Sequence, residues 1–122
     1  MKMRTIVRII CEEFELTQLQ LISTSRERWL TYPRMMVYEL AMEFTYLNTA
    51  QVAMYVKRDT KTVTSGIMRI CKIMAAQPKW RRAFNRCHER LKEIDEHETR
   101  KKSELARARD RASEREQDRS EG

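Results

Sequence analysis

Apolar residues recur at spacings of three and four along much of the chain, the spacing that places them on one face of an α-helix. The pattern predicts a helix over residues 3–14 and a short second helix that Thr17 caps. The apolar positions of these two helices are Ile6, Ile9, Ile10, Phe14, Leu16, Leu19 and Ile22. A polar and basic stretch follows before Pro33, a residue suited to the first turn of a helix. We therefore expect a basic loop that leads into a helix starting at Pro33.

The next run, from Pro33 to Phe44, predicts the central helix of the core. Its apolar positions are Met36, Val37, Leu40, Ala41 and Phe44. A short helix capped by Asn48 or Thr49 is expected next, and then a helix that begins at Asp59 or Thr60 and runs to about Met74. The second of these would bury Val63, Ile67, Ile70 and Met74. Because a turn of about three residues joins the two helices, the pair has the helix-turn-helix pattern.

A last helix is predicted to begin at Pro78 and to pass through Leu91, after which the sequence is charged almost continuously. Apolar positions in that final part are too sparse for a strong coiled-coil seam, although pairs such as Glu96 with Arg100 support a solvated helix. We expect helix to about residue 100 and fraying or disorder beyond it.

Length and composition favour one compact helical unit. The chain has 122 residues with only 2 Gly and 2 Pro, which argues for helices over a turn-rich sheet. The expected fold is all-α: a compact helical bundle with a helix-turn-helix over residues 1–87, then a charged helical or disordered extension over residues 88–122. No segment approaches the ~20 apolar residues of a membrane span, and the N-terminus lacks a signal-peptide pattern. We expect a cytoplasmic, nucleoid-associated protein with no membrane partner.

The net charge of +7 is unevenly distributed. Residues 1–87 hold 15 Lys and Arg against 7 Asp and Glu, a net charge of +8. Residues 88–122 hold 10 against 11, a net charge of −1. The excess therefore belongs to the predicted bundle, as expected if a shaped surface meets a polyanion, although general solubility is the alternative interpretation.

The residues that carry metal or enzyme chemistry form no recognisable site. Cys11, Cys71 and Cys87 lie far apart without a CxxC pair, so we expect buried thiols and neither disulfides nor zinc. Cys87 beside His88 lacks further ligands at metal-binding spacing. No Ser/His/Asp set or carboxylate pair stands out. We expect no metal, no cofactor and no enzymatic activity.

Three features would instead form a surface that binds duplex DNA. The N-terminal half of the second helix of the helix-turn-helix is short or polar enough to approach base edges in the major groove. The loop with Arg26 and Arg28 could reach phosphates or an adjacent minor groove. Arg34 is expected at a helix start, beside amides that can bind phosphate. The expected contacts on the helix are Asp59, Thr60, Lys61, Thr62 and Ser65.

Each of these features also has a purely structural explanation. Asp59 or Thr60 can serve only as a helix cap. Lys61, Arg69 and Lys72 can form an ordinary solvated face, and Arg26 and Arg28 can be surface loop charges. Any two short helices in a bundle can also produce the helix-turn-helix pattern. The combination of all three features is what favours DNA.

From Ile6 to about Cys87 the sequence resembles the C-terminal DNA-binding domain of the bacterial replication initiator DnaA. The resemblance rests on LTQLQLISTSRERWLTYPRMMVYELAMEFT and on KRDTKTVTSGIMRICKI. The family's SxxRxR…PR block is present as Ser23, Arg26, Arg28, Pro33 and Arg34, and its RDxxTV core as Arg58, Asp59, Thr62 and Val63. The resemblance implies a helical bundle in which the helix after Asp59 enters the major groove and the Arg26 loop reaches the minor groove. It also places Arg34 at a phosphate and Arg58 among the DNA-binding residues.

Two departures from the family pattern bear on what is recognised. Thr60 and Lys61 stand where the family usually has His then Thr, and Ser65 replaces a later His. The glycine that commonly precedes the Arg-Asp pair is absent, and Lys57 occupies the turn. The resemblance thus implies duplex binding with an altered base preference.

We expect a sequence-preferring duplex-DNA binder that acts as an accessory or regulatory factor in replication initiation or transcription. The chain has no GxxxxGK[ST] phosphate loop, so nucleotide hydrolysis by this chain alone is not expected, and we expect the DNA-binding domain to stand alone here. The alternative is a protein-interaction adaptor that holds a replication initiation protein through the charged tail or through an exposed apolar face such as Trp29, Tyr32 and Tyr38. The oligomeric state and the role of the charged tail stay open.

Overall fold

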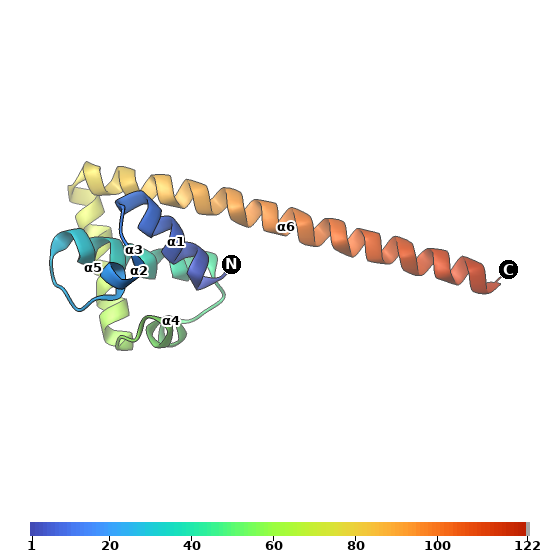
Figure 1. The fold of residues 1–122 in the computed structure, drawn as a ribbon, viewed down its shortest axis with the longest axis horizontal. Helices are drawn as coiled ribbons and strands as arrows, with labels where there is room; N and C mark the ends of the chain where they lie inside the picture. Colours follow the sequence, from blue (N-terminus) through green and yellow to red (C-terminus); the bar gives the residue numbers. More distant parts are fainter. Residues whose placement is uncertain (122) are drawn as a thin grey trace. The chain divides into compact units, whose positions relative to one another are not determined.

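The computed structural model describes the backbone of residues 1–121 and the side chains of residues 1–112. Within this part the chain forms six helices and no strand (Figure 1). In chain order they are α1 (Met3–Phe14), α2 (Gln18–Ile22), α3 (Arg28–Phe44), α4 (Thr49–Val56), α5 (Thr60–Ala76) and α6 (Pro78–Glu121). The predicted all-α fold is confirmed.

The two short helices begin with capping boxes that the sequence encodes locally. Thr17 Oγ1 accepts from the Gln20 amide at 3.1 Å, and Gln20 Oε1 accepts from the Thr17 amide at 2.9 Å. Asn48 and Gln51 make the same reciprocal pair, both bonds at 2.9 Å. Each box satisfies two amides that a helix start leaves without partners. The predicted cap at Thr17 is confirmed, and Asn48 rather than Thr49 caps α4.

Helix α3 lies at the centre of the bundle and packs against α1, α2 and α5. The apolar faces predicted from periodicity meet there, and the side chains with no exposed surface include Ile6, Ile10, Met36, Leu40, Ala41, Val63 and Ile70. Phe14, Phe44 and Ile67, which were expected on the same faces, are only half-buried. The prediction is wrong for Leu19 and Ile22 of α2, which are exposed. The centre of the core is thus built from the 3–4 spacing of the three helices α1, α3 and α5.

The predicted start of α3 at Pro33 is wrong, because the helix begins five residues earlier at Arg28. The Glu27 carbonyl accepts the first helical bonds, from the Leu30 amide at 3.0 Å and the Thr31 amide at 2.9 Å. Pro33 lies inside the helix, where its missing N–H removes one i→i−4 bond. Burial of Leu30 and Tyr32 in the core favours the longer helix despite this loss.

Helix α6 begins at Pro78, as predicted, and its first turns pack on α1 and α3. The Trp80 ring lies 4.9 Å from the Tyr32 ring in a T-shaped arrangement and 5.9 Å from the Phe14 ring. Further along, Arg86 pairs with Glu13 at 2.6 Å and Arg90 pairs with Glu12 at 2.5 Å. These contacts hold the first part of α6 against α1 and α3.

Contacts divide the chain into two units, the first being Met1–Leu91 and the second beginning at Lys92. The expected fraying beyond about residue 100 is wrong for the described backbone, since α6 continues to Glu121. No Gly or Pro occurs between Pro78 and Gly122, and oppositely charged residues recur at helical spacing, both of which favour helix. No helix in the described part of the chain combines the length and apolarity needed to cross a membrane.

The three thiols differ in their surroundings. Cys11 and Cys87 are buried as expected, and burial raises the pKa of Cys87 to about 12. The expectation is wrong for Cys71, which is exposed because it lies on the outer face of α5, one position beyond the buried Ile70.

Candidate nucleic-acid interface

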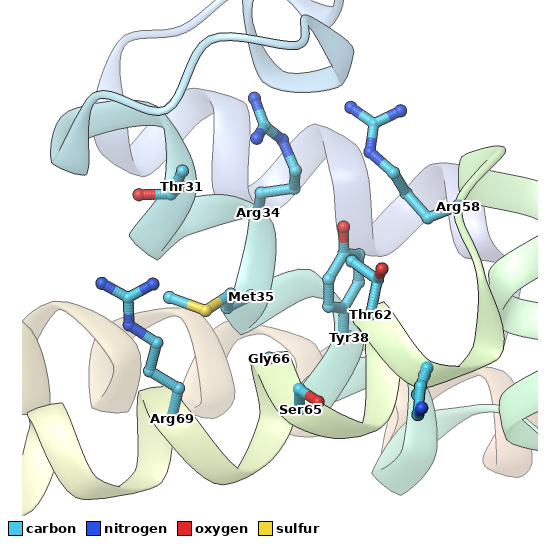
Figure 2. Close-up of a pocket in the computed structure, with 10 residues that line it drawn as sticks. Thr31, Arg34, Met35, Tyr38, Arg58, Thr62, Ser65, Gly66 and Arg69 are labelled. Atoms are coloured by element: carbon cyan, nitrogen blue, oxygen red, sulfur yellow. The ribbon is translucent and has the colours of Figure 1, made fainter.

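A groove of about 420 Å³ lies between α3 and α5 (Figure 2). It is lined by Thr31, Arg34, Met35, Tyr38, Arg58, Lys61, Thr62, Ser65, Gly66 and Arg69. Four of these side chains are cationic and none is acidic, so the groove concentrates positive charge on one face of the bundle. Such a surface attracts a polyanion.

Gly66 lets α5 approach α3 closely at the floor of this groove. A Cβ atom at Gly66 would lie 3.1 Å from Cδ2 of Tyr38 and 3.2 Å from Cγ of Met35. Both distances are shorter than an ordinary carbon–carbon contact of about 3.5–4.0 Å. The absence of a side chain at this position therefore sets the spacing of the two helices.

The N-terminal half of α5 presents the polar residues predicted to contact DNA. Thr60, Lys61, Thr62 and Ser65 are all exposed. Asp59 is the N-cap of α5 by backbone conformation, but its side chain makes no capping hydrogen bond. Its carboxylate is thus not committed to the cap, the role that the purely structural interpretation would give it.

The turn of the helix-turn-helix consists of three residues, as predicted, and includes an unusual backbone conformation. Lys57 ends α4 in the left-handed region, at φ 57° and ψ 47°. This conformation carries a steric cost for a residue with a Cβ and favours glycine, which accounts for the glycine that the family commonly has in this turn. The Arg58 amide then donates to the Ala53 carbonyl at 3.0 Å and closes the end of α4.

Arg34 and Arg58 direct their guanidinium groups toward the segment between α2 and α3. Arg34 Nε donates to the Leu21 carbonyl at 2.7 Å and its Nη1 to the Ser25 carbonyl at 3.2 Å. Arg58 Nη2 donates to the carbonyls of Ile22 at 3.1 Å and Ser23 at 2.9 Å. Both side chains point the same way in Figure 2.

The two guanidinium groups also shape the electrostatics of the groove. Burial lowers the pKa of Arg34, and its Nη2 is buried without a hydrogen-bond partner among the described residues. Burial raises the pKa of the Tyr38 hydroxyl, although Arg58 and Arg34 oppose this shift. Figure 2 shows that hydroxyl directed toward the two arginines.

Arg26 and Arg28 lie outside the groove lining. Both are exposed, and neither side chain makes a hydrogen bond or ion pair with another described residue. Arg26 lies in the loop after α2, whereas Arg28 is the first residue of α3. The expected position of Arg34 at a helix start is wrong, because α3 begins at Arg28 and the amides next to Arg34 lie in the helix interior.

The structure brings most of the predicted residues together in two adjoining hollows. Arg34, Arg58, Lys61, Thr62 and Ser65 line the groove. Asp59 and Thr60 line a second hollow beside the turn, which also includes Arg58 and Thr62. Sequence reasoning placed Arg69 only on a solvated face, without a role in the site, and missed Thr31. Helical periodicity could have identified Arg69, since it lies four residues after Ser65 on the same face.

Comparison with protein families identifies this arrangement. Residues 3–70, more than half of the chain, match the family described as the bacterial DnaA protein helix-turn-helix. The chain belongs to this family. The predicted resemblance is therefore confirmed, and DNA binding through a helix-turn-helix follows from membership. A sequence search among curated proteins gives no match.

Proposed function

We propose that this DnaA-type domain binds preferred sequences in duplex DNA with α5 in the major groove. Arg26 and Arg28 would contact an adjacent stretch of backbone or minor groove. The proposed contacts on α5 and its cap are Asp59, Thr60, Lys61, Thr62 and Ser65. Binding of this kind suits an accessory or regulatory factor in replication initiation or transcription.

The observation that carries the proposal is the cationic groove beside the exposed polar half of α5. A major groove about 12 Å wide admits one α-helix, and phosphates flank it on both sides. Lys61 and Arg69 supply charge along the same helix face that carries Ser65. Polar groups for base edges and cations for phosphates thus occur on one surface.

Base preference is proposed to depend mainly on Thr60 and Lys61. A lysine can donate to guanine O6 and N7, whereas a threonine favours a thymine methyl contact or a single hydrogen bond. The family's usual His-Thr pair presents different groups at these positions. The preferred site should therefore differ from the ordinary initiator box at one or two base pairs, each worth about 1–3 kcal/mol.

Fluorescence anisotropy with an initiator-box duplex and a scrambled duplex, at two salt concentrations, tests duplex binding. Lys61→Ala should weaken binding about tenfold or more, because it removes a contact at the bases. Arg4→Ala is the matched control, since it removes one exposed positive charge outside the groove. Equal losses in both variants would mean that only overall charge matters.

Selection from randomised duplexes tests the base preference. The native chain and the double variant Thr60→His, Lys61→Thr should yield different consensus sequences. Identical consensus sequences would place specificity elsewhere.

Adaptor function is the weaker candidate. Of the three aromatics considered for it, Tyr32 and Tyr38 are buried in the core and only Trp29 is partly exposed. A chain that binds no duplex in either assay would favour the adaptor, with a replication initiation protein as the proposed partner.

A further inference from the structure

The loop that carries Arg26 is held by two arginines from other elements. Arg34 of α3 and Arg58 of the helix-turn-helix turn donate hydrogen bonds to four backbone carbonyls of residues 21–25. Arg58 lies 36 residues from Ile22 in sequence, so this is a long-range contact. We call Arg34 and Arg58 the arginine clamp.

The guanidinium groups of the clamp donate to carbonyl oxygens at the C-terminal end of α2. The carbonyls of Leu21 and Ile22 are among the last four of that helix, which have no intrahelical partners. Guanidinium groups satisfy such carbonyls and also complement the negative end of the helix dipole. Because α2 has only five residues, it has little stability of its own and depends on such outside contacts.

We infer that the arginine clamp is a positioning device that fixes the Arg26 loop relative to α5. Arg58 immediately precedes Asp59, the N-cap of α5, so its side chain joins the start of the DNA-facing helix to the loop. Arg26 is itself free of protein partners among the described residues, and its reach is set by the loop backbone. This inference rests on the proposed function and assigns Arg58 to the loop rather than to a phosphate.

The hydrogen-bond pattern favours positioning over direct phosphate contact. Arg58 Nη2 already donates to two carbonyls, and its Nη1 donates to the Lys57 carbonyl at 3.3 Å. Lys61 and Arg69, in the same groove, make no hydrogen bond or ion pair with another described residue. Those two side chains are therefore the groove cations that stay available to the DNA.

The substitution Arg58→Lys in the full chain separates the two roles. Lysine keeps the charge but loses the planar fork, so it can serve a phosphate as a point charge but cannot hold two carbonyls as arginine does. Hydrogen exchange of the free protein is measured at Ser23 and Glu27, whose amides donate hydrogen bonds beside the loop. We expect exchange there to rise about tenfold, with α1 and α5 unchanged.

Binding to the initiator-box duplex supplies the functional test. Arg58→Lys should weaken binding about tenfold, because Arg26 loses its fixed position. Arg4→Lys, the matched control at an exposed arginine outside the groove, should leave both exchange and affinity near native values. In the Arg58→Lys background, Arg26→Ala should cost at least about threefold less affinity than in the native chain, because the two residues act as a unit.

The outcomes decide between the roles. Unchanged loop exchange, or fully independent effects of Arg26→Ala and Arg58→Lys, would overturn the clamp. A rise in exchange spread over α1 and α5 would also overturn it, as a sign of general destabilisation. If Arg58→Lys does not fold, Arg34→Lys provides the same exchange measurement through Leu21 and Ser25. A native chain that binds no duplex refutes the proposed function, while exchange in the free protein still decides the clamp.

Discussion

Replacing Gly66 by alanine tests the packing that forms the floor of the groove. The added methyl group would lie 3.1 and 3.3 Å from two carbons of the Tyr38 ring, and 3.2 Å from Cγ of Met35. Each distance is several tenths of an ångström below the optimum of about 3.5–4.0 Å. Either α5 moves away from α3, or the neighbouring side chains shift.

Two opposing effects determine the change in stability. Alanine is favoured over glycine by about 1 kcal/mol inside a helix. Overpacking a well-filled site costs about 1–3 kcal/mol. The Met35 side chain can change rotamer, but the Tyr38 ring is buried beneath the groove and has little room to move. We expect the overpacking term, about 2 kcal/mol, to exceed the propensity gain and leave a net loss of about 1 kcal/mol.

Thermal unfolding followed by circular dichroism measures this balance. A loss of about 1 kcal/mol corresponds to a fall in Tm of roughly 4–8 °C for a domain of this size. Ser65→Ala, at an exposed neighbour on the same helix, is the control because it changes helix propensity without meeting Tyr38. A Tm that rises for Gly66→Ala as it does for Ser65→Ala would refute the tight approach of α5 to α3.

Four further predictions concern the turn, the loop, the thiols and the tail. Arg28→Ala should weaken binding to all duplexes alike and lower the salt slope by roughly one unit, whereas a loss on one sequence alone would indicate direct base contact. Lys57→Gly should raise the free energy of unfolding by about 0.5–1 kcal/mol, and with it the urea midpoint, because glycine adopts the left-handed conformation at φ 57° without steric strain. An unchanged midpoint would count against strain at this residue. Ellman's reagent should modify the exposed Cys71 well before Cys87, which is buried with its pKa raised to about 12; equal rates would contradict the burial. Truncation after His97 should leave Tm and duplex affinity nearly unchanged, because the sequence of residues 98–122 contains few apolar residues; a large drop in either would show that the tail contributes.

Much of the fold was predictable because its determinants are local. The apolar spacing of α1 and α5, and the capping residues Thr17 and Asn48, act within a few positions of themselves. The start of α3 was not predictable by the same rules. Pro33 signals a helix start locally, but the burial of Leu30 and Tyr32 against distant parts of the chain outweighs that signal.

The candidate site also has a part that local sequence pattern predicts and a part that depends on long-range contacts. Periodicity and polarity predicted the exposed face of α5, including Lys61 and Ser65, since a helix face follows from spacing alone. The partners of Arg58 could not be predicted in this way. They are backbone carbonyls, which every residue possesses, so no sequence pattern marks Ile22 and Ser23 as acceptors for a side chain 36 or 35 residues away.

The helix-turn-helix turn connects these observations, because its three residues have different structural tasks. Lys57 ends α4, Arg58 holds the loop, and Asp59 begins α5. A change at Arg58 should therefore affect the loop and DNA binding together. The exposed residues Thr60 and Lys61, the first two of α5, have no such structural role, so a change there should affect base preference alone. This separation lets Thr60 and Lys61 depart from the usual family pair while the fold of the domain is kept.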